Sequence, residues 1–309
     1  MKARLEALGH ESLFITPETF RTVPCPSYPE IRLAMTRPAV IGRHIASFHP
    51  DAVHIATEGP LGWMARSWCL KHGRPFTTAF HTRFPQYLHA RWRIPLGMTY
   101  PILRRFHAPS ATIMVATQSI EDDLKSRGFG PIRRWTRGVD TDRFRPRAKT
   151  ILAFKRPISL FVGRVAVEKN IEDFLRLPLE GTKVVIGEGP QRADLEVRYP
   201  DVRFLGEKVG EDLAQHYAAA DVFVFPSRTD TFGLVLLEAL ACGVPVAAYP
   251  VPGPLDVIDH SGAGVLDDDL GAAVRAALAI SPERCRAHAE TFSWERSVRQ
   301  FLDNLVVVG

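Results

Sequence analysis

Cysteine is scarce in this chain, which has four cysteines among 309 residues. No two of them have the spacing of a zinc knuckle or of a C-x-x-C redox pair, so neither kind of centre is indicated. We expect four reduced thiols, some of them buried, at Cys25, Cys69, Cys242 and Cys285.

Long apolar runs are also missing. No stretch reaches the roughly 18 apolar residues that a membrane-spanning helix needs. Glu6 and Gly9 interrupt the first ten residues, which excludes the apolar core of a signal peptide. The composition, 46% hydrophobic and 24% charged, is typical of a globular protein. The sequence therefore predicts a cytoplasmic protein with about two domains.

What the sequence does have is an uneven charge distribution. The formal net charge of +5 divides into +12 for residues 1–150 and −7 for residues 151–309. This asymmetry indicates two domains with different partners. The basic half suits an anionic substrate or lipid surface, or it is a solvated face without a partner. No nucleic-acid-binding motif is present, so we expect no nucleic acid partner.

Short apolar segments alternate with helix-like segments along most of the chain. This alternation predicts βαβ units with parallel sheets, and two such series predict two doubly wound α/β domains. The strand-like segments are 12–16, 52–57, 76–81, 111–117, 159–163, 183–187, 202–205, 222–226 and 244–248. The helical segments include 61–71, 85–106 with a break near Pro95, 120–127, 171–175, 191–198, 211–219, 233–241 and 294–305.

The polar stretch 137–157 contains two prolines and coincides with the change of charge sign, so it is the expected connection between the domains. We place an N-terminal domain at 1–145 and a C-terminal domain at 146–291. A last helix within 292–309 is expected to pack back toward the N-terminal domain.

Two glycine-containing turns follow predicted strands of the second half. Gly163 ends one strand, and Arg164 and Lys169 come next, where two cations and a helix N-terminus favour an anion. Gly187 and Glu188 follow the next strand, where small residues leave room for a base or a ribose. Both segments also fit ordinary strand-to-helix turns, and neither is a P-loop or a simple dinucleotide fingerprint.

The segment FPSRTDTFGLVLLEALACGVPV, residues 225–246, is the most informative. Asp230 lies in a polar loop and Glu238 lies eight residues later, inside an apolar helix. Such a carboxylate needs a partner, and a ribose diol is a fitting one; a solvated glutamate on an exposed face is the alternative. The first amides of the helix can bind an anion. They belong to Phe232, Gly233, Leu234 and Val235.

Together these motifs resemble glycosyltransferase family 4, and in particular its GDP-mannose-dependent mannosyltransferases and sulfolipid synthases. The resemblance covers almost the whole chain and implies a GT-B fold of two facing Rossmann-like domains. In the first half it rests on LGHE (8–11), GPLG (59–62), FHTR (80–83), RFH (105–107) and RGVD (137–140).

The resemblance also implies residue roles. Arg164 and Lys169 would neutralise the donor diphosphate, and Glu238 would hold the ribose. Gly163, Gly187, Glu188 and residues 232–235 would complete the donor site. The catalytic residues would be His81, beside the anomeric carbon, and Asp230, which stands where the family has glutamate. A structural histidine is the alternative for His81. Glu58 and Gly59 would lie on the acceptor side.

The implied activity is a retaining, metal-independent transfer of a hexosyl group from GDP-mannose or a UDP-hexose to a lipid or glycan. We expect no cofactor and no metal: Asp140 and Asp142 imitate a D-x-D motif but fall in the connection, and Asp267–Asp269 is expected to cap a helix. The alternatives are a catalytically impaired fragment that binds a nucleotide sugar, and a Rossmann oxidoreductase or epimerase.

Two further expectations concern the first half. The family's first strand and its glycine-rich loop, roughly 20–30 residues, have no counterpart before residue 12. We therefore expect an empty strand position in the sheet beside 12–16. It would arise either because the start of the chain was assigned too late or because the chain is a defective fragment.

Residues 83–105 mix arginines with aromatic residues, which suits a peripheral contact with the anionic inner membrane face. Aromatic side chains packed in the core, with solvated arginines, are the alternative.

Overall fold

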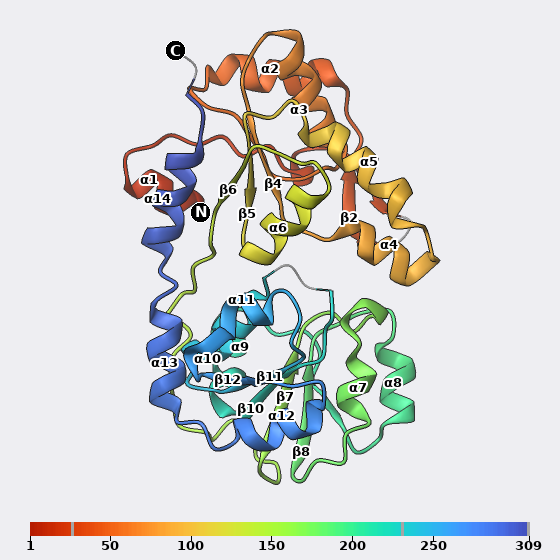
Figure 1. Ribbon diagram of the computed structural model, residues 1–309, viewed down its shortest axis with the longest axis vertical. Helices are drawn as coiled ribbons and strands as arrows, with labels where there is room; N and C mark the ends of the chain where they lie inside the picture. The colour runs from red at the N-terminus through yellow and green to blue at the C-terminus, as the bar shows by residue number, and fades with distance from the viewer. Residues whose placement is uncertain (26–27, 230–231, 308–309) are drawn as a thin grey trace. The chain divides into compact units, whose positions relative to one another are not determined.

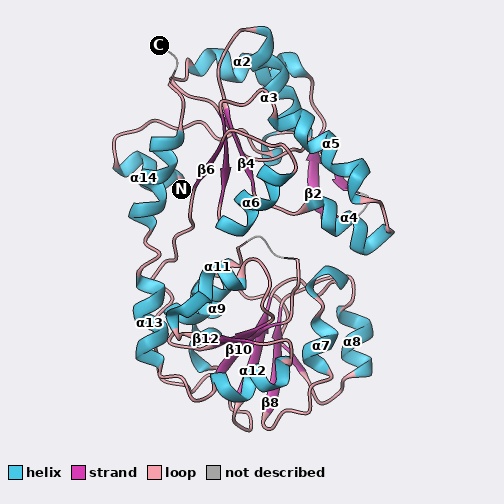
Figure 2. Ribbon diagram, viewed as in Figure 1, coloured by secondary structure: helices cyan, strands magenta, loops and turns pink. Residues whose placement is uncertain are grey.

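The computed structural model describes residues 1–25, 28–229 and 232–307 (Figure 1), without the side chains of 28–30, 90, 91 and 259. The chain forms two compact units. Unit 1 comprises residues 1–81, 95–136 and 298–309, and unit 2 comprises residues 82–94 and 137–297. Each unit contains a parallel sheet with helices packed on it (Figure 2).

The parallel sheet of unit 1 has four strands, in their order along the chain. They are β3 (His54–Ile55), β4 (Thr77–Phe80), β5 (Thr112–Val115) and β6 (Ile132–Arg134). All residues of β4 and β5 are buried, because helices cover both faces. The helices of this unit are α1 (Lys2–Ala7), α2 (Pro38–Phe48), α3 (Pro60–Lys71), α5 (Leu96–His107), α6 (Gln118–Ser126) and the part of α14 (Trp294–Asn304) from Val298 onward.

Alternate residues of the central strands of unit 1 face two separate cores. Phe80 and Ile113 belong to a cluster with residues of α5 and α6. Met114 faces the other side, where it belongs to a cluster with Leu5 of α1 and Phe301 of α14. The last helix thus closes one face of this sheet.

The predicted strand at 12–16 is wrong. These residues form no strand, and Leu13 and Phe14 are 44% and 48% exposed. A strand needs a neighbour for its backbone hydrogen bonds, and no described strand pairs with this segment. Unit 1 instead contains a hairpin that the sequence did not predict, β1 (Thr22–Cys25) paired antiparallel with β2 (Tyr28–Ala34) as a separate sheet.

The sheet of unit 2 has the strand order β12-β11-β10-β7-β8-β9, with every pair parallel. The strands are β7 (Ile158–Val162), β8 (Thr182–Ile186), β9 (Arg203–Phe204), β10 (Val222–Phe225), β11 (Val246–Ala248) and β12 (Gly264–Leu266). Because the order reverses between β7 and β10, a ligand crevice is expected where these two strands end.

Several described helical elements lie wholly within unit 2, which also contains the first four residues of α14. They are α4 (Phe84–Trp92), η2 (Val167–Lys169), α7 (Ile171–Leu175), α8 (Arg192–Arg198), α9 (Gly210–Ala219), α10 (Leu234–Ala241), α11 (Pro254–Ile258), η3 (Asp259–Ser261), α12 (Leu270–Ala277) and α13 (Pro282–Glu290). The predicted break near Pro95 is confirmed, because α4 ends at Trp92 and α5 begins at Leu96. The predicted cap is also confirmed: Asp269 Oδ1 accepts a 3.0 Å hydrogen bond from the amide of Ala272.

All four cysteines are free thiols, as expected. Burial raises the pKa of Cys69 to about 11 and the pKa values of Cys242 and Cys285 to about 12. Cys25 is partly exposed. In the described part of the chain, no helix is both long and apolar enough to cross a bilayer.

Candidate functional site

Two glycine turns at the ends of β7 and β8 in unit 2 are joined through their backbones. The amide of Gly163 donates to the carbonyl of Ile186 at 3.0 Å, and the amide of Val165 donates to the carbonyl of Glu188 at 2.9 Å. A Cβ on Gly187, where φ is +140°, would lie 2.0 Å from the carbonyl oxygen of Gly163. Position 187 therefore accepts only glycine, and the two turns form one unit.

Arg164 and Lys169 follow the first of these turns, and both are partly buried. Lys169 ends η2, against which α4 packs within the same unit. The loop is also fastened to the loop after β10, because Thr229 Oγ1 donates a 3.1 Å hydrogen bond to the carbonyl of Glu168. The structure thus places both cations in one short loop at the switch point of the sheet.

Sequence reasoning missed a cluster of polar residues beside this loop. Asp173 Oδ2 accepts hydrogen bonds from Asn170 Nδ2 at 2.6 Å and from the Tyr249 hydroxyl at 2.7 Å. The guanidinium of Arg228 lies 3.5 Å from the centre of the Tyr249 ring and 4.0 Å from Asp173 Oδ2. Burial, followed by the bond to Asp173, raises the pKa of Tyr249 to about 12.

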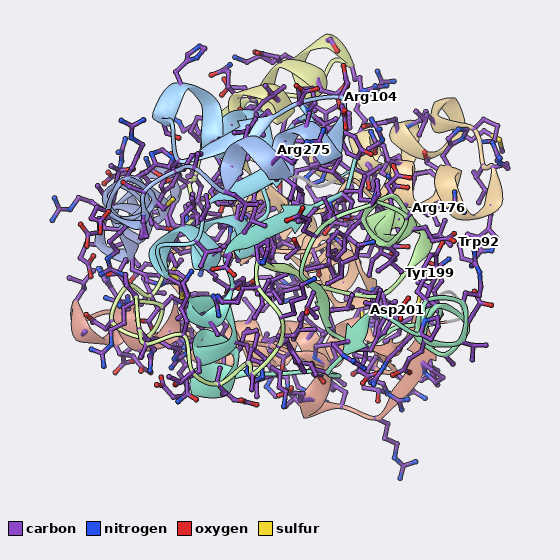
Figure 3. The ribbon with its side chains drawn as sticks, turned by 90° about the horizontal axis from the view of Figure 1, so that it is seen from below. Trp92, Arg104, Arg176, Tyr199, Asp201 and Arg275 are labelled. Atoms are coloured by element: carbon purple, nitrogen blue, oxygen red, sulfur yellow. The ribbon has the colours of Figure 1, made fainter. Side chains whose placement is uncertain are left out.

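This cluster connects the loops that follow β7, β10 and β11. Asn170 adds a second link, because its Nδ2 donates to the carbonyl of Pro226 at 3.2 Å. A sequence clue was present: Arg228 and Tyr249 both come directly after predicted strands, where ligand-binding loops begin. Farther along α7, Arg176 donates from Nε to the Tyr199 hydroxyl at 3.2 Å and connects α7 to the end of α8 (Figure 3).

Glu238 lies on α10 and is partly buried. The hydroxyl of Tyr217 on α9 donates a 3.0 Å hydrogen bond to Glu238 Oε2. Burial raises the pKa of Glu238, and the hydrogen bond from Tyr217 opposes part of this shift. Burial also raises the pKa of Tyr217 well above its ordinary value, so the phenol stays a donor. The alternative of a fully solvated glutamate does not hold.

The residue before α10 has a backbone conformation that favours glycine. Gly233 has φ +81° and ψ +70°, a left-handed conformation that glycine adopts without strain. Phe232 is buried, whereas Leu234 is 44% exposed. Val235 is partly buried. Asp230, predicted to contact the sugar, lies outside the described residues.

Glu188 has a partner of its own. Its carboxylate forms an ion pair with Arg192 of α8 and is 54% exposed. The described residues of the predicted donor site therefore belong to segments that follow the strands of one sheet. Each of them follows the end of a strand or lies in the helix after such an end.

In unit 1, Glu58 and His81 each follow one of two neighbouring parallel strands. Ile55 of β3 pairs with Thr78 of β4, and Glu58 and His81 each lie three residues farther along. The His81 ring centre is 5.4 Å from that of Trp135. Glu58 Oε1 lies 3.1 Å from Nε2 of His107, a contact that sequence reasoning missed. Gly59 precedes α3 as its N-cap residue.

The segment RGVD, residues 137–140, has a structural role. A Cβ on Gly138 would lie 2.7 Å from the backbone of Trp294, and Val139 donates to the carbonyl of Phe292 at 3.1 Å. Burial lowers the pKa of Arg137 to about 10. Asp140 Oδ1 accepts a 3.1 Å hydrogen bond from the amide of Arg143, as in a capped turn.

Profiles of two protein families match the chain. The one described as "Glycosyltransferase Family 4" matches residues 1–143, and the one described as "Glycosyl transferases group 1" matches residues 156–281. The chain is 31% identical to a GDP-mannose-dependent alpha-mannosyltransferase of Mycobacterium tuberculosis, over 85% of this chain and 76% of that protein. It is also 31% identical to the sulfoquinovosyl transferase SQD2 of Arabidopsis thaliana, over 84% of this chain but only 57% of the plant protein.

Solved structures resemble the chain in fold. Sucrose-phosphate synthase from Thermosynechococcus elongatus matches with a TM-score of 0.74 and 22% identity, over 86% of this chain and 75% of that one. Anabaena HepE in complex with UDP-glucose matches with a TM-score of 0.67 and 17% identity, over 85% and 81% of the two chains. The predicted α/β fold of the GT-B type, with two Rossmann-like sheets, is confirmed.

Proposed function

Because the chain belongs to glycosyltransferase family 4, we propose that it transfers a hexosyl group from a nucleotide-diphosphate sugar to a hydroxyl of a lipid or glycan, with retention of configuration. The observation that carries the proposal is the pair of joined glycine turns at the switch point of unit 2, with Arg164 and Lys169 in the same loop. Glycine backbone and two cations at strand ends are what a diphosphate needs.

The donor would lie in the C-terminal domain, 146–291. Arg164 and Lys169 bind the diphosphate, and the N-terminal amides of α10 add hydrogen bonds to phosphate and sugar. Gly163 and Gly187, with Glu188 beside them, leave room for the nucleoside. Glu238, held through one oxygen by Tyr217, accepts hydrogen bonds from the ribose diol. Such preorganised charges stabilise a diphosphate leaving group without rearrangement.

In the reaction, the bond between the anomeric carbon and the β-phosphate oxygen breaks, and the acceptor oxygen forms a bond to the same face of that carbon. The acceptor proton moves to the departing phosphate. Arg164 and Lys169 stabilise the negative charge that develops there, so no metal is required. His81 and Asp230 are assigned to the sugar, and Glu58 and Gly59 to the acceptor in the N-terminal domain, 1–145.

The relatives support this choice of substrates. One is named for its dependence on GDP-mannose and another for transfer of sulfoquinovose, whereas HepE has been solved with UDP-glucose. We therefore propose GDP-mannose or a UDP-hexose as the donor.

A peripheral contact with an anionic membrane fits the exposed face of α5. Met98 and Ile102, one helical turn apart, are 66% and 60% exposed. Arg104 and Arg105 of the same helix are also exposed. Apolar and basic side chains together on one helix suit the interface of an anionic bilayer. A lipid-linked acceptor at the inner membrane face would then lie close to the enzyme.

The test is nucleotide release from GDP-mannose, UDP-glucose and UDP-sulfoquinovose, with and without dioleoylglycerol in mixed micelles. Release that rises with the lipid supports the proposal, and the anomeric configuration of the product reports retention. Nucleotide binding without any release would instead identify an impaired binding protein.

A further inference from the structure

His107, at the C-terminal end of α5, is completely buried and has polar partners on both ring nitrogens. Nε2 lies 3.1 Å from Glu58 Oε1, and Nδ1 lies 2.9 Å from Thr78 Oγ1. Thr78 is the second residue of β4 and Glu58 lies three residues after the end of β3, so one imidazole connects α5 with a strand and with the loop that follows its neighbour.

The hydrogen bonds around Nδ1 have a defined direction. Ser110 Oγ has one proton and donates it to the carbonyl of His107 at 2.7 Å. Thr78 is therefore the donor in its 3.2 Å bond to Ser110 Oγ, and its oxygen accepts from Nδ1–H of His107. The other ring nitrogen, Nε2, is the one that bonds to the carboxyl group of Glu58.

Apolar rings surround this pair. The ring centres of Phe80, Phe106 and Phe129 lie 6.1, 5.0 and 6.1 Å from that of His107. Arg66 of α3 fixes the same end of α5, because its guanidinium donates to the carbonyl of Phe106 at 2.9 Å. In such surroundings a hydrogen bond is stronger than in water, so the bond to His107 favours one orientation of the Glu58 carboxyl.

Glu58 itself is not fully enclosed, since 17% of its side chain is exposed. It also lies in the loop after β3, as His81 lies directly after β4, and ligands of parallel sheets bind where strands end. A histidine with a purely structural role needs only buried hydrogen-bond partners, such as Thr78 at Nδ1 and any buried acceptor at Nε2. Here its second bond holds a carboxylate that reaches the surface.

Resting on the proposed function, we infer that Glu58 binds a hydroxyl of a polyol or sugar acceptor, and that His107 is the positioning residue that holds its carboxylate. One oxygen of Glu58 is bonded to His107, which leaves the carboxylate able to accept from an acceptor hydroxyl.

The experiment compares matched variants of the full chain. His107→Gln keeps a donor near the place of Nε2, whereas His107→Asn keeps one near Nδ1 and loses the bond to Glu58. Glu58→Gln changes the carboxylate itself at a partly exposed position. Each is assayed for the ratio of transfer to hydrolysis and for the acceptor KM, with whichever of GDP-mannose, UDP-glucose and UDP-sulfoquinovose gives the fastest nucleotide release by the unchanged chain. The acceptor probe is dioleoylglycerol in micelles or octyl α-mannoside, whichever the unchanged chain glycosylates faster.

We expect His107→Asn and Glu58→Gln to lower the transfer-to-hydrolysis ratio roughly ten-fold or more, as for loss of a hydrogen bond to a charged group. The acceptor KM should rise while the donor KM and the rate of hydrolysis stay near those of the unchanged chain. His107→Gln should recover most of the ratio. A variant with a structural defect alone would lose transfer and hydrolysis together.

Equal ratios in the unchanged chain, His107→Asn and Glu58→Gln would overturn this inference and leave the proposed function intact. If the unchanged chain releases no nucleotide, or transfers to neither probe, the proposed function fails and the inference fails with it.

Discussion

The hydroxyl of Tyr217, on α9, donates a 3.0 Å hydrogen bond to Oε2 of Glu238, on α10. Tyr217 is completely buried, so its hydroxyl cannot bond to bulk water in place of Glu238. The bond fixes the carboxylate in a helix whose other side chains are mostly apolar. The carboxyl group is thereby held where the proposed ribose would lie.

Tyr217→Phe should leave the Glu238 carboxylate without this donor. We expect a loss of about 1–3 kcal/mol in the free energy of unfolding, the usual effect of an unsatisfied buried polar group. The nucleotide affinity should also fall, because the carboxylate is no longer held. Urea unfolding and calorimetric titration with GDP and UDP measure the two effects. Unchanged stability would show that Tyr217 does not support Glu238.

The raised pKa of Glu238 predicts a pH dependence of stability. The folded protein binds the proton more tightly than the unfolded chain, whose carboxyl has the ordinary pKa of 4.5. The contribution is therefore complete below pH 4.5 and is lost as the pH rises through the folded pKa. Glu238→Gln should remove this loss. Urea unfolding of both proteins from pH 4.5 to 8 should show the smaller decrease in the variant.

The diphosphate assignment predicts that Arg164→Ala and Lys169→Ala each reduce turnover by about 10²-fold or more, or roughly 2.7–4 kcal/mol of transition-state stabilisation. Arg176→Ala is a matched control, because Arg176 is an exposed residue directly after α7 that binds Tyr199 and Glu172. Its turnover should stay within about two-fold of the unchanged chain, as for most surface substitutions. Near-normal rates in both loop variants would disprove the assignment.

Gly187→Ala tests the joined turns. Its Cβ would lie 2.0 Å from the carbonyl oxygen of Gly163, so the turns must separate. Gly210→Ala is the control, because Gly210 also has a positive φ, +57°, but no atom within 4 Å of the added Cβ. We expect the control to cost about 1 kcal/mol of stability and to keep nucleotide binding. Gly187→Ala should lose more stability and most of its nucleotide binding. Equal effects would mean that the contact with Gly163 is unimportant.

The elements that sequence reasoning located best are those whose burial is visible locally. The strands β7 to β11 of unit 2 follow from runs of apolar residues, and the helix boundaries at Pro95 and Asp269 follow from a proline and a cap. The short strand β12 was not predicted. The hairpin of residues 22–34 was missed because its three prolines argue against strands. The segment 12–16 has a strand-like composition, but pairing partners decide whether a strand forms.

The residues of the candidate site also differ in whether a local pattern in the sequence reveals them. Arg164, after the end of β7, and Glu238, inside α10, could be found because each lies in a local motif. The bond from His107 to Glu58 joins residues 49 apart in the sequence. Tyr249 and Asp173 are 76 apart. Only the folded chain brings such pairs together, and no local pattern in the sequence indicates the pairing.

The metal-independent mechanism predicts that EDTA leaves nucleotide release largely unchanged, because cationic side chains rather than a metal bind the diphosphate. The measurement is the rate of release after chelation and after addition of Mn²⁺ or Mg²⁺. A strict requirement for either metal would contradict this mechanism and would make Asp140 and Asp142 the candidate metal ligands.

The α5 face predicts a salt-sensitive contact with anionic membranes. Each exposed cation contributes about 1 kcal/mol near an anionic surface, and salt screens this attraction. Met98 and Ile102 add an apolar contribution that salt does not screen. Sedimentation with anionic and neutral vesicles, at low and high salt, separates the two.

In this assay Arg104→Gln/Arg105→Gln should weaken binding to anionic vesicles at low salt, whereas Met98→Ser/Ile102→Ser should weaken the binding that remains at high salt. Arg176→Ala, on an exposed helix of unit 2, is the control and should bind as the unchanged chain does. Because α5 also ends in His107, thermal unfolding of each variant must remain unchanged for the comparison to stand. Binding to neutral and anionic vesicles alike, or to neither, would mean that these side chains are simply solvated and that the acceptor is reached without an anionic surface.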